Sequence, residues 1–145
     1  MFSKSCEYAL QAILYICLNA QKNRPVGLKD IAEAQKIPLH FLSKVLQELV
    51  KHKVLDSAKG PKGGFSLVDD PNNMYLLKIV EIVDGSDLFD RCGIGLKECS
   101  DEYPCPIHFD YQLVKEKIKN LLSEKTIYQL CIDVKNGDAI VSFSE

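Results

Sequence analysis

KIPLHFLSKVLQELVKHKVLDSAKGPKGGFSLV, residues 36–68, contains the pattern from which the architecture is predicted. A break at Ile37-Pro38 precedes a helical pattern, because proline suits the first position of a helix, where its missing N–H would have no partner. From Leu39 onward, apolar residues recur at helical spacing and are expected to face inward. The inward set is Leu39, Leu42, Val45, Leu46 and Leu49, and the opposite face carries His40, Ser43, Lys44, Gln47 and Lys51.

The second half of the stretch has the pattern of a β-hairpin. Residues 54–57 and 65–68 are short strand candidates, and the Gly/Pro-rich residues 58–64 form the turn between them. Glycines allow the tip of such a hairpin to approach another backbone closely. Lys59 and Lys62 place two cations at this tip, where phosphates or a DNA minor groove are within reach.

A further short helix precedes this stretch. Leu28, Ile31 and Ala32 mark a helix that ends near Lys36, after a loop over residues 23–27. Two short helices joined by a tight turn, the second with a basic outer face, describe a helix-turn-helix. The periodicity fits an ordinary pair of packed helices equally well. The β-hairpin that follows the two helices corresponds to a wing, and it favours DNA binding. The second helix would then enter the major groove with its N-terminal end first.

Charge is distributed unevenly along the chain, although the net charge is only −2. Between Lys36 and Gly64 six lysines stand against two acids, a balance of +4. Between Asp84 and Asp110 seven acids stand against Arg91 and Lys97, a balance of −5. Binding to nucleic acid requires a cation-rich stretch, because counterion release supplies most of the non-specific affinity. Charge alone would also fit an ordinary solvated lysine face.

The remainder of the chain is predicted to be helical on both sides of an irregular segment. Helices are expected over residues 3–20, from Leu76 to Gly85, from Pro106 onward and over 126–132, whereas residues 86–105 show no period and the tail 136–145 is of uncertain order. The apolar face of the first helix contains Cys6, Ala9, Leu10, Ile13, Leu14 and Cys17. The long helix carries a coiled-coil-like seam of Ile107, Tyr111, Val114, Ile118 and Leu121, widened by Leu113 and Leu122.

The predicted fold is mostly α with a small β-hairpin wing: a winged helix-turn-helix followed by a long dimerisation helix. Its parts are a DNA-binding domain over residues 1–85, a cysteine loop over 86–105, a dimerisation helix and short helix over 106–132, and a tail over 133–145. A homodimer is favoured because helix-turn-helix proteins usually read two half-sites with two-fold symmetry. No window is apolar enough to span a membrane, so a cytoplasmic protein is expected.

Three of the six cysteines lie within fourteen residues, as Cys92, Cys99 and Cys105, and His108 follows. Structural zinc sites usually pair cysteines two to four residues apart, so the spacing fits zinc poorly. Disulfides would leave one odd thiol in a reducing compartment. An iron–sulfur cluster is larger and favours thiolate ligands, which a pliable loop can wrap around it. His108 is the candidate fourth ligand, with helix capping as the alternative.

The helix beginning Ser3-Lys4-Ser5-Cys6-Glu7-Tyr8-Ala9-Leu10, the helix-turn-helix, the wing KGPKGGFSL over 59–67 and the three-cysteine loop together resemble the Rrf2 family over about residues 1–132. The resemblance implies a homodimeric winged-helix regulator, most often a repressor, that binds pseudo-palindromic double-stranded DNA. It implies a 2Fe–2S or 4Fe–4S cluster on the three loop cysteines. In the family's cluster regulators a histidine matching His108 is the fourth ligand. In its nitric-oxide-sensitive repressors an acid of the partner subunit takes that place, which Glu7 matches.

The resemblance also implies DNA contacts from the start of the recognition helix and from the wing. The matching residues are His40, Ser43, Lys44 and Lys59, and the wing reasoning adds Lys62. The family's cluster regulators have Glu at the position of Ser43 and Arg at that of Lys59, so a different base preference is expected. Lys lacks the bidentate fork that Arg offers to guanine.

Two other functions remain open at this point. One keeps DNA binding and replaces the cluster with thiol chemistry or zinc. The other is a small iron–sulfur carrier without DNA binding, against which the lysine-rich helix and wing argue. An enzyme is not expected, because the sequence offers no nucleophile–base pair, phosphate-binding glycine loop or paired carboxylates in a plausible cleft.

Overall fold

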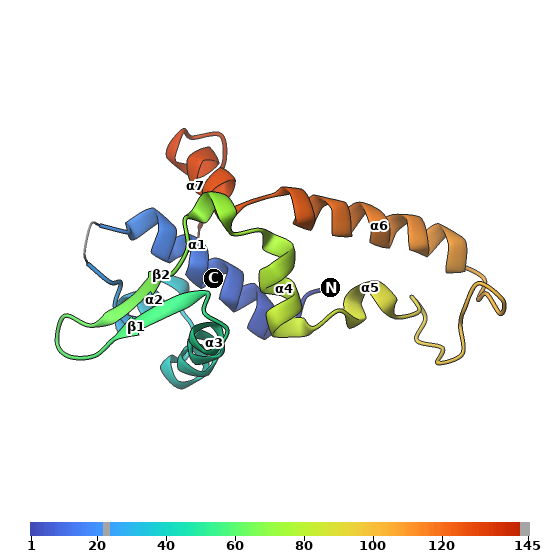
Figure 1. Ribbon diagram of the computed structural model, residues 1–145, viewed down its shortest axis with the longest axis horizontal. Helices are drawn as coiled ribbons and strands as arrows, with labels where there is room; N and C mark the ends of the chain where they lie inside the picture. The colour runs from blue at the N-terminus through green and yellow to red at the C-terminus, as the bar shows by residue number, and fades with distance from the viewer. Residues whose placement is uncertain (22–23, 143–145) are drawn as a thin grey trace.

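The computed structural model describes residues 1–21 and 24–142 and is mostly helical with a two-stranded antiparallel hairpin, as the sequence predicts (Figure 1). No helix in the described part of the chain is long and apolar enough to cross a membrane. The elements are α1 Lys4–Asn19, α2 Leu28–Gln35, α3 Leu39–Lys51, β1 Leu55–Ala58, β2 Gly64–Leu67, the 3-10 turn η1 Pro71–Asn73, α4 Leu76–Asp84, α5 Asp87–Asp90, α6 His108–Glu124 and α7 Ile127–Lys135.

Helix α1 runs through the centre of the core. Ser3 caps it, because its side chain accepts a hydrogen bond from the Cys6 N–H at 3.0 Å. The helix contacts α2, α3, α4, α7 and β2. Its buried residues are Cys6, Ala9, Ala12, Ile13, Ile16 and Cys17. Leu10 and Leu14, predicted for this face, are only half-buried, because the burial stripe is turned toward Ala12 and Ile16.

Helices α2 and α3 form the predicted helix-turn-helix. Lys36 ends α2 in a left-handed conformation with φ of 54°, and its backbone N–H bonds back to carbonyls of the last turn. Pro38 is the N-cap of α3, one position before the helical position predicted for it. Leu42, Val45, Leu46 and Leu49 are buried as expected. The prediction for Leu39 was wrong: it is 43% exposed, because the helix begins there beside the wing and not over the core.

Strands β1 and β2 form the wing, with Leu55 opposite Leu67 and Ala58 opposite Gly64. The loop predicted over 23–27 holds an extra bridge, because the N–H groups and carbonyls of Val26 and Phe65 exchange two hydrogen bonds of 2.8 Å. Asn23 of that loop lies outside the described residues. Gly64 makes this close approach possible, since a Cβ there would lie 2.2 Å from the Val26 carbonyl oxygen. The bridge ties the wing to the connection between α1 and α2.

The C-terminal half differs from the prediction at its boundaries. Helix α5 lies within the segment expected to be irregular, and α6 begins at His108, two residues after Pro106. The last helix, α7, continues to Lys135 instead of ending near residue 132. Thr126 and Gln129 form a capping box at its start. Of the tail, residues 143–145 lie outside the described part of the chain.

The apolar stripe of α6 is divided between two environments. Leu122 is buried, and Ile118 packs against the core beside it. Ile107, just before the helix, and Val114 and Leu121 follow at steps of seven residues and remain 39%, 49% and 53% exposed. Helix α6 extends away from the body of the molecule and contacts α4 and α5, which lie below it in Figure 1. The second edge of the stripe therefore has no partner within the described part of the chain.

Candidate metal centre and nucleic-acid interface

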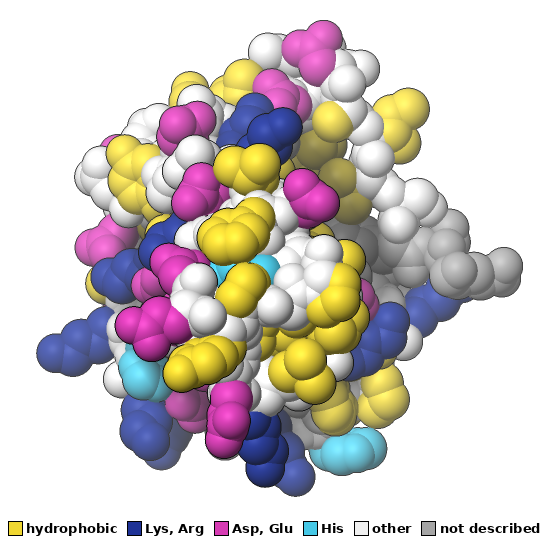
Figure 2. Space-filling view, turned by 90° about the vertical axis from the view of Figure 1, so that its right-hand side faces the viewer, with side chains coloured by type: hydrophobic (Ala, Val, Ile, Leu, Met, Phe, Trp, Pro, Cys, Tyr) yellow, Lys and Arg dark blue, Asp and Glu magenta, His cyan; other side chains and the backbone are white. Residues whose placement is uncertain are grey.

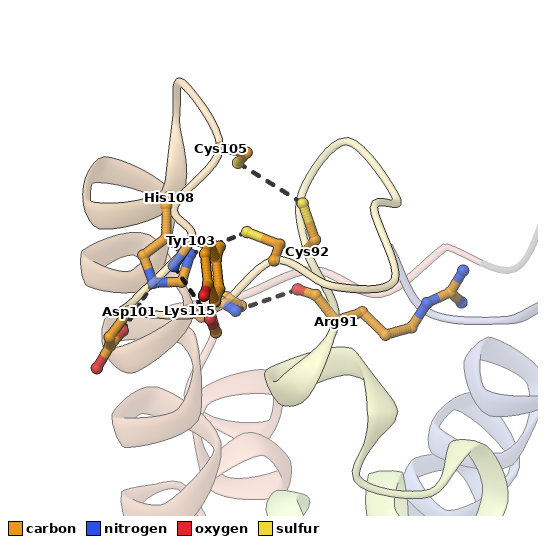
Figure 3. A network of polar contacts seen from close by, with 9 residues as sticks. Arg91, Cys92, Asp101, Tyr103, Cys105, His108 and Lys115 are labelled. Atoms are coloured by element: carbon orange, nitrogen blue, oxygen red, sulfur yellow. Dashed lines mark hydrogen bonds and ion pairs between the residues drawn. The ribbon is translucent and has the colours of Figure 1, made fainter.

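The cysteine loop, predicted over residues 86–105, occupies residues 91–107 in the structure, where it links α5 to α6 at the far end of the molecule from the wing (Figure 1). Two contacts anchor its first residues to α6. The Lys115 Nζ donates to the Arg91 carbonyl at 3.1 Å (Figure 3), and Gly93 lies against Tyr111 so closely that a Cβ would be 2.9 Å from the ring. The first residues of the loop are therefore fixed to α6. The loop itself contains turns and bends but no helix or strand.

The three loop cysteines converge. Their Sγ atoms all lie within 4.8 Å of one another, and those of Cys92 and Cys105 are 3.6 Å apart (Figure 3). Cys105 is buried, and Cys92 and Cys99 are half-buried. Cys6, Cys17 and Cys131 are instead buried in the helical core. The fold of the loop thus brings Cys92 and Cys105, thirteen residues apart in the sequence, together with Cys99 into one group of sulfur donors.

His108 stands at the first position of α6, directly beside this group. Its Nδ1 is 3.1 Å from the Cys99 Sγ, and its Nε2 is 2.8 Å from the Asp101 Oδ1. Its side chain is only 15% exposed. Within the described residues His108 touches the Cys99 side of the group and is not among the mutually close sulfur donors. It therefore offers one ring nitrogen at the edge of the site.

Hydrogen bonding shifts the acidity of the loop thiols. Burial opposes ionisation of Cys92, but backbone N–H groups of Ile94 and Leu96, aided by the neighbouring thiols, lower the pKa of Cys92 from 9.0 to about 7. For Cys99, a bond from the Cys105 backbone N–H favours the thiolate, but burial and the adjacent thiols raise its pKa above the ordinary value. A thiolate is thus available in the group near neutral pH, as a metal ligand requires.

The core thiols behave in the opposite way. Burial, with the Asp84 carboxylate as the next cause, raises the pKa of Cys6 to about 12. Burial also raises the pKa of Cys17 to about 12, and its contact with Cys131 acts in the same direction. These cysteines are packed as small apolar groups, as predicted for Cys6 and Cys17.

The donor set fits two kinds of centre. Thiolates about 2.3 Å from one tetrahedral ion lie roughly 3.8 Å apart. The three sulfurs are spaced much as they would be around a single zinc ion, whereas His108 lies outside this mutually close set and reaches only the Cys99 side. An iron–sulfur cluster distributes its thiolate ligands over several irons and needs wider spacing. Residues 91–107 make turns and bends with no ladder of hydrogen bonds to break, so they can widen around a larger group. The chemistry of the donors fits a cluster as well.

Glu7 is not brought to the cysteines within one chain. Its carboxylate pairs with the Lys4 Nζ at 3.0 Å on the first turn of α1. It is absent from the set of mutually close donors among the described residues. A ligand role for Glu7 would require the partner subunit, as the resemblance implied.

A physical link joins the loop to the DNA-binding part. Asp84, the last residue of α4, accepts hydrogen bonds from the Ser3 backbone N–H at 2.9 Å and from the Ser3 hydroxyl. Ser3 is also the N-cap of α1. Helix α4 contacts α1, α3 and α6, and one residue separates Gly85, its C-cap, from α5. A continuous path of packed helices therefore connects the cysteine loop, through α5 and α4, to α1 and α3.

Four of the five residues predicted to contact DNA are exposed, and Ser43 is half-buried. A groove of about 540 Å³ is lined by residues at the start of α2, by Leu39 at the start of α3 and by residues of the wing between Ser57 and Phe65. His40 and Lys44 are exposed on α3, and Ser43 accepts a hydrogen bond from the Gln47 amide at 3.2 Å. Lys59 and Lys62 are exposed at the wing tip. The groove therefore lies between the start of α3 and the wing, but none of the five residues predicted to contact DNA is among those that line it.

Sequence reasoning missed several residues that shape these sites. From the sequence, no role in the metal site was assigned to Asp101, Gly93 or Lys115. The signal for Asp101 was its position two residues after Cys99. No pattern in the sequence signals the Gly93–Tyr111 approach or the Ser3–Asp84 bonds, because both join segments distant along the chain.

Known proteins share both the sequence and the fold. A putative HTH-type transcriptional regulator of Aquifex aeolicus is 36% identical over 132 residues, which cover 90% of each chain. The HTH-type transcriptional regulator IscR of Xenorhabdus nematophila is 31% identical over 133 residues, 92% of this chain and 78% of that protein. The solved IscR of T. potens has a TM-score of 0.75 at 22% identity, covering 99% of this chain and 94% of its own. CymR, the global cysteine regulator of B. subtilis, also has a TM-score of 0.75, at 20% identity and covering 91% and 96%.

These similarities define a winged-helix transcription regulator. A family model described as Rrf2, iron-dependent transcriptional regulator, matches residues 2–133. The chain therefore belongs to the Rrf2 family. The two solved structures are under 25% identical and bear on the fold alone.

Proposed function

We propose that this chain is a repressor whose affinity for operator DNA is set by an iron–sulfur cluster held by Cys92, Cys99, Cys105 and His108. The observation that carries the proposal is the convergence of three thiols within 4.8 Å beside an imidazole. Similarity to IscR proteins and to an iron-dependent regulator family supports it. When bound, the cluster would supply a redox-active centre sensitive to nitric oxide, oxygen or iron shortage, and without it the three cysteines and His108 would no longer be tied to one group.

The proposed DNA contacts come from the start of α3 and the wing tip. Lys44, Lys59 and Lys62 supply exposed cations for phosphates, and His40 and Ser43 lie near the helix start that enters the major groove. The acidic cysteine loop lies at the opposite end of the molecule (Figure 1), where acidic and hydrophobic side chains share the surface (Figure 2), so its negative charge is kept away from the proposed DNA contacts. The α4 link joins the two ends.

The proposed active form is a homodimer that reads a pseudo-palindromic operator. The exposed edge of α6, formed by Ile107, Val114 and Leu121, supplies an apolar face for a second copy. Two basic winged-helix domains related by two-fold symmetry would match the two half-sites of the operator. In a dimer, Glu7 of the partner subunit would be the alternative fourth ligand of the metal centre.

Anaerobic purification followed by iron, sulfide and zinc analysis tests the cluster. Wild-type protein should be brown and carry iron with acid-labile sulfide, and Cys92→Ser should be colourless. Cys131→Ala, which removes a thiol from the helical core, is the matched control and should stay brown. Colourless, iron-free wild-type protein from anaerobic cells would contradict the proposal.

A zinc-dependent regulator is the second candidate. The 3.6 Å separation of the Cys92 and Cys105 sulfurs favours it, since this is the spacing around a single tetrahedral ion. One equivalent of zinc in place of iron and sulfide, lost in Cys92→Ser and retained in Cys131→Ala, would establish this candidate over the first.

A further inference from the structure

The imidazole of His108 is held from both of its ring nitrogens. Nδ1 faces the Cys99 sulfur at 3.1 Å, and Nε2 faces the Asp101 Oδ1 at 2.8 Å (Figure 3). The Phe109 ring packs edge-on against the imidazole, with centroids 4.9 Å apart. One nitrogen is therefore directed to the thiol group and the other to a carboxylate.

The two partners determine where the proton of a neutral imidazole lies. A carboxylate only accepts hydrogen bonds, so the proton belongs on Nε2 and the lone pair on Nδ1. Ligating histidines in proteins almost always donate their second N–H to such an acceptor, which fixes ring orientation and strengthens the ligand. We propose that Asp101 is a positioning residue that selects the Nε2–H tautomer of His108 and directs its Nδ1 to the metal centre. The ligand role of Nδ1 rests on the proposed function, whereas the place of the proton does not.

The local backbone explains why Asp101 and not a neighbouring acid takes this role. Asp101 lies in a turn in which the Ser100 N–H donates to the Tyr103 carbonyl at 3.3 Å and the Tyr103 N–H donates to the Ser100 hydroxyl at 3.2 Å. Cys99 immediately precedes this turn, so one short segment supplies both a thiol and the carboxylate. Glu102, the next residue, is exposed and has no hydrogen-bond or ion-pair partner in the described part of the chain.

The setting of the ring has a chemical consequence for the centre. A carboxylate bonded to Nε2–H makes Nδ1 a stronger donor, which favours the more oxidised state of a bound iron centre. Removing the carboxylate is expected to weaken retention of the metal and to move its reduction potential to a less negative value. Asp101→Asn keeps an oxygen that can accept a hydrogen bond from His108 but removes the negative charge. This variant therefore separates the orientation of the His108 ring from the effect of the charge on the metal centre.

Metal-free protein provides the first test. Nitrogen-15 NMR of the histidine rings is recorded at about pH 8, above the ordinary imidazole pKa of about 6.5. Wild type, Asp101→Asn and the control Glu102→Ala should all show the Nε2–H form of His108, and Asp101→Ala should show a mixture. An Nδ1–H form in wild type, or an unchanged spectrum in Asp101→Ala, would overturn the inference whatever metal the protein binds.

Anaerobically loaded protein provides the second test. Transfer of the metal to a chelator should be roughly 10- to 100-fold faster in Asp101→Ala than in Glu102→Ala. Asp101→Asn should lose metal at an intermediate rate and have a less negative potential. Equal rates in the two alanine variants would refute the role of Asp101 and leave the metal centre intact. If wild type binds neither iron nor zinc, the proposed function fails, and the NMR result alone decides the role of Asp101.

Discussion

Single cysteines in this chain differ sharply in chemistry, although all six are free thiols. Hydrogen bonds from backbone N–H groups outweigh the effect of burial at Cys92 and lower its pKa to about 7. Burial instead raises the pKa of Cys6 and Cys17 to about 12. Sequence spacing was enough to separate the loop thiols from the core thiols. It could not reveal which loop thiol ionises first, because the donors to Cys92 come from the folded path of residues 94–96.

Alkylation of the metal-free, reduced protein should follow this order. At pH 7 about half of Cys92 is thiolate, so iodoacetamide should modify it first. Cys99 is the matched comparison, because it lies in the same loop, is also half-buried and has a raised pKa. Mass spectrometry of timed samples measures the rates. Equal rates for Cys92 and Cys99 would contradict the assigned acidity.

Alkaline pH should destabilise the fold through the core thiols. Their folded pKa lies above the ordinary 9.0, so the folded state binds the protons more tightly and its stability is lost as pH rises from about 9 toward 12. The slope is limited to about 1.4 kcal/mol per pH unit for each thiol. Denaturant unfolding at several pH values above about 8 measures it. Cys17→Ala should flatten the slope, and an unchanged slope would contradict the prediction.

At the scale of elements, the helix-turn-helix and wing were predictable because their signals are local. The Ile37-Pro38 break, the apolar spacing of α3 and the glycines of residues 60–64 all lie within thirty-three residues. The bridge between Val26 and Phe65 was not predictable, since it joins the wing to a segment that reads as a loop. Helix α5 was missed because its single turn is too short to show a period.

The wing depends on the absence of a side chain at Gly64. Gly64→Ala should destabilise the protein by roughly 1–3 kcal/mol, because the new Cβ would clash with the Val26 carbonyl and φ is +153°. Gly60→Ala is the control, since Gly60 also lies in the wing with a positive φ of +102° but a Cβ there would meet nothing within 4 Å. Thermal unfolding of the two variants provides the comparison. Equal melting temperatures would show that the bridge contributes nothing.

The basic residues of α3 and the wing should account for the salt dependence of DNA binding. Lys44→Ala and Lys59→Ala should each reduce the slope of log K against log salt by about 1, because each removes a phosphate contact. Fluorescence anisotropy at several salt concentrations measures these slopes. Lys117→Ala, on the exposed side of α6, should leave the slope unchanged. Slopes identical to wild type in both test variants would place the DNA elsewhere.

At the scale of the whole molecule, the sequence predicted an apolar stripe on the long helix, and the structure divides it. Ile118 and Leu122 pack on the core, whereas Val114 and Leu121 remain exposed. Periodicity could not distinguish these edges, because both belong to one continuous apolar stripe along the helix. The route from the cysteine loop through Asp84 to Ser3 was likewise unpredictable, since those residues are 81 positions apart.

Breaking the exposed edge of α6 should produce monomers. Val114→Glu combined with Leu121→Glu places two charges on the face proposed for the second copy, where burial of unpaired charge is costly. Light scattering after size-exclusion chromatography should show half the wild-type mass. Lys117→Glu on the exposed polar side serves as the control. A double variant that stays dimeric would show that the subunits meet elsewhere.

The central claim is that occupancy of the cysteine site sets the affinity for DNA. The most direct measurement is an anaerobic binding isotherm on a DNA site selected by the protein from a random library, recorded before and after removal of the metal centre, with Cys92→Ser alongside. The account predicts a change of at least tenfold in Kd when the wild-type centre is removed, and no change for Cys92→Ser. Identical isotherms for the loaded and metal-free wild-type protein would contradict it.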